Sequence, residues 1–92
     1  MYLEIVSPEA TLFKGDVDSV SVPGVNGEFE MLNNHAPIIS LLKAGDVKIS
    51  GNNISLNESV AAKFKKHQKG YALSISSGTV EMKDNKIIVL AD

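Results

Sequence analysis

Apolar residues alternate with polar ones at period two along most of the chain. Because successive side chains of a strand point to opposite faces, each alternating pair places its apolar members on one face of a sheet. Nine valines and eight isoleucines supply 17 of the 92 residues, which also favours strands over helices. The alternating pairs are Leu3/Ile5, Val20/Val22, Phe29/Met31, Val47/Ile49, Ile54/Leu56, Leu73/Ile75, Val80/Met82 and Ile87/Val89.

Short groups of turn-forming residues separate these pairs, and each group contains a residue that bends readily or accepts a positive φ. Eight or more short strands in so small a chain predict an all-β fold: one domain over residues 1–92, built as a β-sandwich or flattened barrel. No repeat or linker suggests a second domain. The predicted turns are Lys14–Asp16, Pro23–Gly27, Ala44–Asp46, Gly51–Asn53 and Lys83–Lys86.

The segment Asn57–His67 breaks the alternating pattern. It fits a short helix capped by Asn57 or Ser59, with Val60, Ala61 and Phe64 directed inward. It also fits a strand with Val60, Ala62 and Phe64 on one face. We favour the strand, because no other segment of the chain is helical.

The composition excludes several kinds of functional site. The chain has no cysteine, which removes disulfides, thiolate metal sites and a cysteine nucleophile, and two histidines, His35 and His67, are too few for most metal centres. All nine basic residues are lysine, and an arginine-free chain of net charge −2 is a poor nucleic-acid binder. The start Met1–Glu4 has no basic leader, and no apolar stretch approaches the roughly 20 residues of a membrane span. We expect a small cytosolic domain without a cofactor.

Hydrolytic catalysis would need a nucleophile, a base and an orienting acid held by a motif such as a nucleophile elbow, and none is present. A small hydrolase using Ser77 and His35 is therefore the weakest alternative. The lysines around His67 could attract phosphate groups or acidic lipid. We favour a solvated strand edge, where lysines discourage aggregation. These lysines are Lys63, Lys65, Lys66 and Lys69.

The stretch Val22–Glu30 holds two strong turn dipeptides, Pro-Gly and Asn-Gly, within five residues. We expect a connection longer than a minimal two-residue hairpin, projecting from the sheet with Val25 at its tip. Glu28 and Glu30 would lie on one strand face. An apolar tip beside two carboxylates suits docking against a polar, basic surface better than it suits catalysis. A solvated hairpin without a partner is the other interpretation.

His35 precedes an apolar strand, and Pro37 biases the residue before it to an extended conformation. On the residues alone, a lone histidine in this position is more often structural than functional.

Taken together, these two stretches resemble the signature of the ATP synthase epsilon subunit. Both ends of the chain are similar to that family as well, with residues 1–50 and 71–92 matching better than the middle. The blocks that carry the resemblance are Gly27-Glu28, His35-Ala36-Pro37-Ile38-Ile39, Lys43-Ala44-Gly45, Ile5–Glu9, Phe13–Val17, Ser77–Met82 and Ile88–Asp92.

The resemblance implies a β-sandwich of about ten strands at the foot of the central stalk of a proton-translocating ATP synthase. In that family the domain binds the gamma subunit, rests on the ring of membrane c subunits and rotates with both, so that ion flow drives ATP synthesis. It has no active site of its own. The implied location is peripheral, on the cytoplasmic face of the bacterial inner membrane, with membrane association only through the complex.

The resemblance extends to a few individual positions. Glu28 matches the family position that faces the polar loops of the c subunits, which usually present a basic side chain. Ser7 and His35 match positions near the gamma interface. The implied neighbours of Glu28 in the c-ring contact are Val25, Asn26, Gly27 and Glu30.

Most bacterial members of that family continue past the Val-Leu-Ala-Asp block into two antiparallel helices that can inhibit ATP hydrolysis. The sequence here ends at Asp92. If 92 residues is the natural length, the resemblance implies a subunit that couples the rotor without inhibiting by that route.

A free-standing β-sandwich binding module, for example one that recognises carbohydrate, is the main alternative. Such sites rely on exposed aromatic platforms, whereas the aromatic residues of this chain mostly fall on core-facing alternations. They are Tyr2, Phe13, Phe29, Phe64 and Tyr71.

Overall fold

The alternating pattern folds into ten short strands in the computed structural model, which describes all 92 residues. The single helical element is one 3-10 turn. The elements in chain order are β1 (Tyr2–Val6), β2 (Thr11–Asp16), β3 (Ser19–Gly24), β4 (Gly27–Leu32), β5 (Ile38–Leu42), β6 (Gly45–Ser50), η1 (Ala61–Lys63), β7 (Phe64–His67), β8 (Gly70–Ile75), β9 (Gly78–Lys83) and β10 (Lys86–Ala91).

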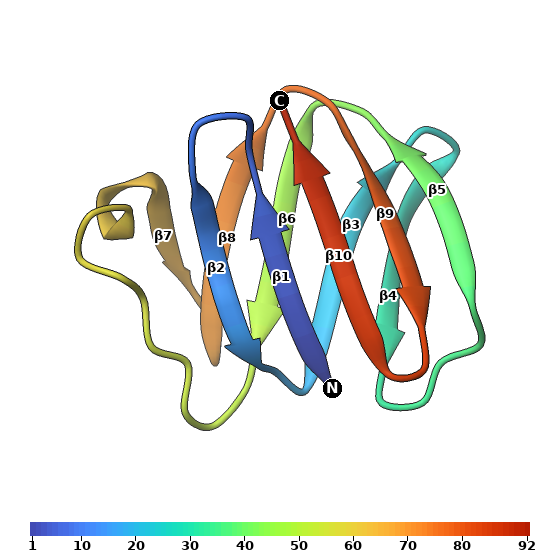
Figure 1. The fold of residues 1–92 in the computed structure, drawn as a ribbon, viewed down its shortest axis with the longest axis horizontal. Coiled ribbons are helices and arrows are strands. Elements are labelled where there is room, and N and C mark those ends of the chain that lie inside the picture. The colour runs from blue at the N-terminus through green and yellow to red at the C-terminus, as the bar shows by residue number, and fades with distance from the viewer.

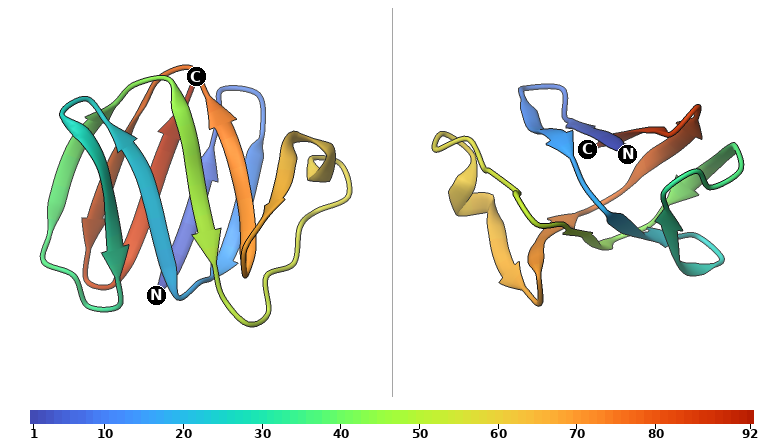
Figure 2. Two further views of the ribbon diagram at one scale, coloured as in Figure 1. Left: turned by 180° about the vertical axis from the view of Figure 1, so that it is seen from behind. Right: turned by 90° about the horizontal axis from the view of Figure 1, so that it is seen from below.

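All ten strands are hydrogen-bonded into one sheet that curls back on itself to form two layers (Figures 1 and 2). The first layer has the order β2-β1-β10-β9-β5, and the second contains β4-β3-β6-β8-β7. Only β1 and β10 pair in parallel; every other pair is antiparallel. The expected all-β sandwich of about ten strands is confirmed.

The chain passes between the layers where β5 leads into β6. β3 pairs with both strands, with Leu42 of β5 opposite Gly24 and with β6 over Ser19–Ser21. Sandwich corners form where one strand bends from sheet to sheet. Gly45 lies at this bend with φ 158°, and a Cβ on it would lie 2.8 Å from Cβ of Pro23. The bend therefore requires a glycine.

The core lies between the two layers and is entirely apolar, with no buried polar or charged residue. The side chains of every alternating pair are buried, except Ile54, Leu56 and Phe29, which are half-buried. The predicted inward faces are therefore confirmed for most strands. The largest fully buried side chains are those of Leu3, Ile5, Met31, Ile49, Met82, Ile87, Val20, Val22, Val47, Val80 and Val89.

The β3–β4 connection differs from the expected long, projecting loop. Gly24 pairs with Gly27, so only Val25 and Asn26 form the turn. Gly27 adopts φ 129°, a conformation that a β-branched residue resists. The backbone N–H of Val25 also donates to the carbonyl of Leu41 at 3.1 Å. The hairpin is short because Gly27 supplies the positive φ of the turn, so no additional loop residue is needed. The hydrogen bond of Val25 holds the turn against β5.

The middle segment also departs from the expected strands. Ile54 and Leu56 are half-buried against the core but belong to no strand, because alternation without a neighbouring strand forms no hydrogen-bonded pair. The segment from residue 57 combines both alternatives: the Asn57 side chain accepts a 2.9 Å hydrogen bond from the backbone N–H of Ser59, η1 follows, and β7 begins at Phe64. The preference for a strand was right only for residues 64–67.

The turn expected at Lys14–Asp16 is also misplaced, because these residues complete β2 and the chain bends after them. A register shift between Ile5 and Val6 lets β2 bury Leu12 and Phe13 in succession. This bulge removes the alternation that would have identified the strand.

Candidate functional site

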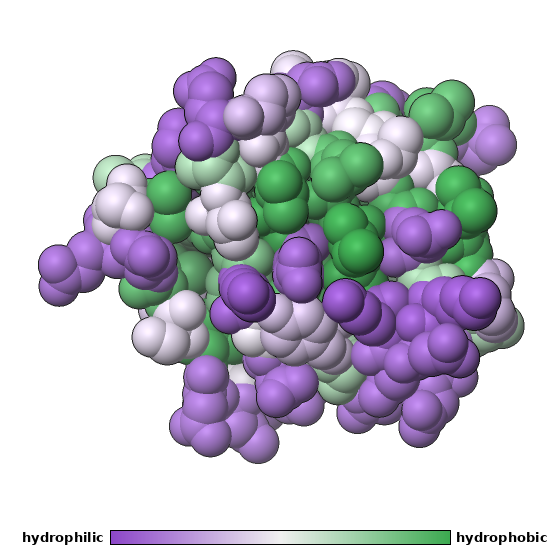
Figure 3. All heavy atoms as spheres, viewed as in Figure 1, coloured by the Kyte–Doolittle hydropathy of each residue, from purple (hydrophilic) through white to green (hydrophobic).

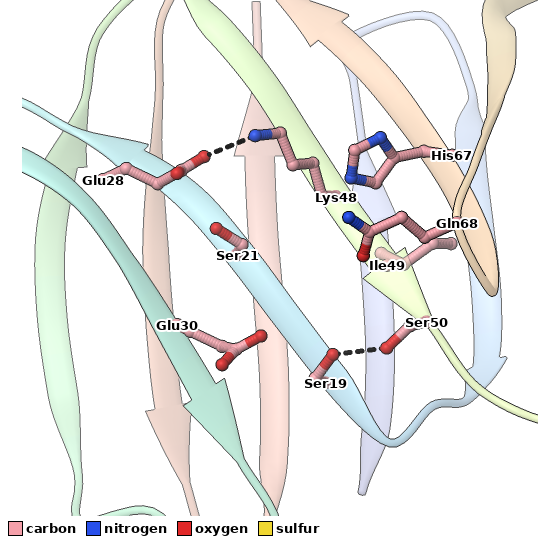
Figure 4. A pocket seen from close by; sticks show the side chains of 9 residues that line it. All are labelled: Ser19, Ser21, Glu28, Glu30, Lys48, Ile49, Ser50, His67 and Gln68. Atoms are coloured by element: carbon pink, nitrogen blue, oxygen red, sulfur yellow. Dashed lines mark hydrogen bonds and ion pairs between the residues drawn. The ribbon is translucent and has the colours of Figure 1, made fainter.

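Glu28 and Glu30 line one wall of a polar groove on the outer face of the second layer (Figure 4). They alternate with the half-buried Phe29, so both carboxylates point away from the core, as predicted. The groove has a volume of about 200 Å³. The residues that define the polar groove are Ser19, Ser21, Glu28, Glu30, Lys48, Ile49, Ser50, His67 and Gln68.

The floor of the polar groove is formed by small side chains of two neighbouring strands. The hydroxyl groups of Ser19 and Ser50 are hydrogen-bonded to each other across β3 and β6 (Figure 4). The far wall comes from Lys48 on β6 and from His67 and Gln68, where β7 turns into β8. The small serine side chains leave room between the carboxylates of β4 and the basic side chains of β6 and β7, so opposite charges can meet across β3.

An ion pair spans this groove. The ammonium Nζ of Lys48 lies 3.0 Å from Oε2 of Glu28, and the two side chains are 34% and 52% exposed. The hydrogen bond from Lys48 lowers the pKa of the Glu28 carboxyl below its ordinary value, against a smaller opposing effect of partial burial. Sequence reasoning missed Lys48. The alternation of Val47 and Ile49 shows that Lys48 points outward. Its pairing with Glu28 could not be read from the sequence, because that contact depends on strand order.

The tip of the hairpin lies beside the first layer. Val25 is 48% exposed, Asn26 and Gly27 are exposed, and Val25 borders a shallow pocket with Leu41 and Leu90. The apolar tip is therefore continuous with apolar residues of β5 and β10, while Glu28 and Glu30 face the polar groove. The structure divides the five predicted c-ring residues between two neighbouring surfaces.

The outer face of the first layer carries unusually exposed apolar side chains. Ile39, Leu41 and Leu90 are 77%, 62% and 53% exposed. Register places Leu41, Thr79, Leu90 and Val6 in one row across β5, β9, β10 and β1. Figure 3 shows hydrophobic atoms gathered on this side of the molecule, bordered below by hydrophilic ones. We define the apolar face by the residues Val6, Ile39, Leu41, Ile88 and Leu90.

The two residues expected near the gamma subunit lie far from each other. Ser7 lies in the β1–β2 connection, where its hydroxyl donates to the carbonyl of Ala10 at 3.2 Å. His35 lies in the β4–β5 connection, with Nδ1 2.8 Å from the carbonyl oxygen of Ala36. These connections are at opposite ends of the molecule (Figure 1). Both residues make local contacts, so neither is held by the core.

The structure also tests the hydrolase and carbohydrate-binding alternatives and the interpretation of the lysine cluster around His67. Ser77 donates a hydrogen bond to the carboxylate of Asp92 at 2.9 Å and lies at the end of the molecule opposite His35, so the hydrolase pairing is wrong. No aromatic side chain is exposed. Lys66 lies over the Tyr71 ring, 5.0 Å from its centroid, on the edge strand β7, as expected for a solvated edge.

No three His, Cys, Asp or Glu side chains are grouped so that they could hold a metal ion. None of the helical structure has the length and apolar character of a membrane span.

Fold and surfaces together define a class: a small all-β sandwich with exposed aliphatic side chains on one outer face and a polar groove on the other. The family model for the ATP synthase delta/epsilon chain, beta-sandwich domain, matches residues 1–92. The chain therefore belongs to this family, as its sequence motifs predicted.

Relatives of known name support the same assignment. The chain is 39% identical over 92 residues to the ATP synthase epsilon chain of Campylobacter concisus, covering all of this chain and 60% of that relative. It is 39% identical over 90 residues to the epsilon chain of Leptospira interrogans, covering 98% of this chain and 59% of the relative. The chain thus spans about 60% of the length of these relatives.

A solved structure shows the same fold. A chain in the cryo-EM structure of the central stalk and c ring of Tetrahymena thermophila mitochondrial ATP synthase matches with a TM-score of 0.74. The sequences are 14% identical, and the match covers 99% of this chain and 62% of that one.

Proposed function

We propose that this chain is a non-catalytic coupling subunit in the central stalk of a proton-translocating ATP synthase, linking the gamma subunit to the c ring. Family membership supports the assignment. The observation that carries it is the pair of unlike outer faces on opposite layers of the sandwich. A partner on one face leaves the other accessible, which a link between two partners requires.

The apolar face is the proposed gamma-binding surface. A partner that contacts both Ser7 and His35 must extend between opposite ends of the molecule, and the apolar face lies along that path (Figures 1 and 3). Contiguous exposed apolar side chains are typical of protein–protein contacts, because covering them removes apolar area from water. The proposed gamma contacts are therefore Ser7, His35, and the side chains of the apolar face between them.

The β3–β4 hairpin is the proposed c-ring contact. Val25, Asn26 and Gly27 would meet the polar loops of the c subunits, with Glu28 and Glu30 supplying negative charge. Both carboxylates are exposed, so each ion pair would contribute below about 1 kcal/mol and mainly set orientation. Such a subunit would lie peripherally at the cytoplasmic face of the bacterial inner membrane, held by its partners.

A pull-down of the chain with the gamma subunit from the same source tests this function. We expect specific capture, weakened by Ser7→Ala and by His35→Ala. Glu28→Lys, on the opposite layer, is the control and should capture gamma as well as the parent does. The same Glu28→Lys chain should couple poorly when reconstituted in membrane vesicles.

Failure of the parent chain to capture folded gamma would contradict the proposal. So would an equal loss of capture in Glu28→Lys, since that residue faces away from the proposed gamma surface.

A further inference from the structure

The two carboxylates of the polar groove have different surroundings. Glu28 is paired with Lys48 at 3.0 Å. Glu30 has neither an ion pair nor a side-chain hydrogen bond, although it lies two residues away on the same face of β4. Figure 4 shows the Glu28–Lys48 pair at one end of the groove and Glu30 beside the serine floor.

Strand register gives Lys48 access to both carboxylates. Ser21 of β3 is paired with Glu30 on one side and with Lys48 on the other. Lys48 therefore lies directly across one strand from Glu30, yet its ammonium reaches the diagonal neighbour Glu28. The intervening serine side chain is too small to block either direction.

We propose that Lys48 is a built-in counter-ion that occupies Glu28, which leaves Glu30 as the carboxylate that receives a cationic side chain from a partner loop. The inference rests on the proposed function only in naming a c-subunit loop as that partner. A cation approaching Glu28 meets a carboxylate that Lys48 already neutralises, and it is repelled by the Lys48 ammonium. A cation bound at Glu30 adds a pair.

Lys48 then controls which carboxylate is available. In Glu28→Gln, Lys48 loses its partner and moves to Glu30, so the partner's cation meets an occupied carboxylate. Removing Lys48 as well frees Glu30 again. If Glu28 instead contacted the partner directly, loss of Lys48 would not compensate for loss of Glu28.

The test measures binding of the chain to the purified c ring in detergent micelles. We expect Glu28→Gln and Glu30→Gln each to weaken binding about threefold, the size typical of one exposed ion pair. The double variant Glu28→Gln/Lys48→Met should return to parental affinity. Its matched control is Glu28→Gln/Lys63→Met, which has the same net charge but retains Lys48 and should stay weak. Glu58→Gln, an exposed carboxylate outside the groove, should bind normally.

Each result decides between the possibilities. A Glu28→Gln/Lys48→Met chain that stays as weak as Glu28→Gln overturns the role of Lys48, as does an unaffected Glu30→Gln chain. A parent that fails to bind the c ring at all contradicts the proposed function itself, and with it the partner named here. Carboxyl NMR on the free chain is independent of any partner: Lys48→Met should raise the pKa of Glu28, and an unchanged value would overturn the pairing.

Discussion

The two outer faces of this sandwich arise from the same alternation but differ in chemistry, because only the first presents several exposed aliphatic side chains. On the first layer, the outward positions include the exposed Ile39, Leu41 and Leu90 beside Glu4 and Glu81. On the second layer they include Ser21, Glu30 and Lys48. The inward positions of both layers are uniformly apolar. The inward residues already account for the fold, so the proposed gamma and c-ring contacts rest on the difference between the outward residues.

The faces should also differ in the physics of binding. Burying apolar side chains gives affinity that is largely independent of direction and of salt. Exposed charges give less affinity, but they set orientation and favour particular partners. A coupling subunit needs both properties: a firm hold on one partner and an oriented contact with the other. Four measurements test whether the two faces differ in this way.

The largest effect should come from a leucine between the layers. Leu3→Ala should lower the free energy of unfolding by about 2–5 kcal/mol, because Leu3 is fully buried and its truncation leaves a cavity. Leu41→Ala removes the same atoms from the apolar face and should change stability by no more than about 0.5 kcal/mol. Urea unfolding of both chains measures the difference. Equal losses would show that the apolar face is part of the core.

The second effect concerns affinity for gamma. The double variant Ile39→Ser/Leu41→Ser should weaken gamma binding at least about tenfold, since burial of one aliphatic side chain is worth about 1.5–3 kcal/mol. Titration calorimetry measures it, with Glu30→Gln as the control from the polar face. Unchanged affinity in the double variant would remove the apolar face from the proposed interface.

The third and smaller effect is the dependence of binding on salt, which should differ between the two faces. Raising ionic strength from about 0.1 M to about 1 M shortens the Debye length from about 10 Å to about 3 Å. Binding of the c ring through the polar groove should weaken several-fold over this range, while gamma binding through the apolar face should hold or strengthen. Affinity measured against both partners in one salt series tests this. Parallel salt curves would contradict the assignment.

The smallest effect is the contribution of the Glu28–Lys48 pair to stability. The folded-state pKa of Glu28 is lowered from its ordinary value of 4.5. The pair therefore stabilises the fold above about pH 4.5, and this stability is lost as pH falls through the lowered pKa. Both side chains are partly exposed, so the contribution should be below about 1 kcal/mol.

Urea unfolding of the parent and Glu28→Gln measures that contribution. The gap between them should be present at neutral pH and close in acid. A gap that persists in acid would come from something other than the ionised pair.

Most strands could be predicted from alternation, and the exceptions have physical causes. β2 could not be recognised from alternation, because a bulge buries Leu12 and Phe13 in succession. β7 is four residues long and only Phe64 in it is buried, so it presents almost no alternation. Ile54 and Leu56 alternate without forming a strand, because no neighbouring backbone pairs with them.

The candidate site was predictable only in part. The shared face of Glu28 and Glu30 follows from their spacing along one strand, and the structure confirms it. The short hairpin was not foreseen, because two overlapping turn signals suggested a longer loop. Lys48 could not be identified at all, since its pairing with Glu28 depends on the β3–β6 register.

The sequence alone determined which side chains face inward, because strand alternation is a local property of consecutive residues. Family motifs in the sequence also indicated the family to which the chain belongs. Which outward residues become neighbours depends on the tertiary structure. Leu41 and Leu90, or Glu28 and Lys48, lie far apart along the chain and meet through strand order and register. Those long-range pairings are set by packing of the whole core, which no local pattern specifies.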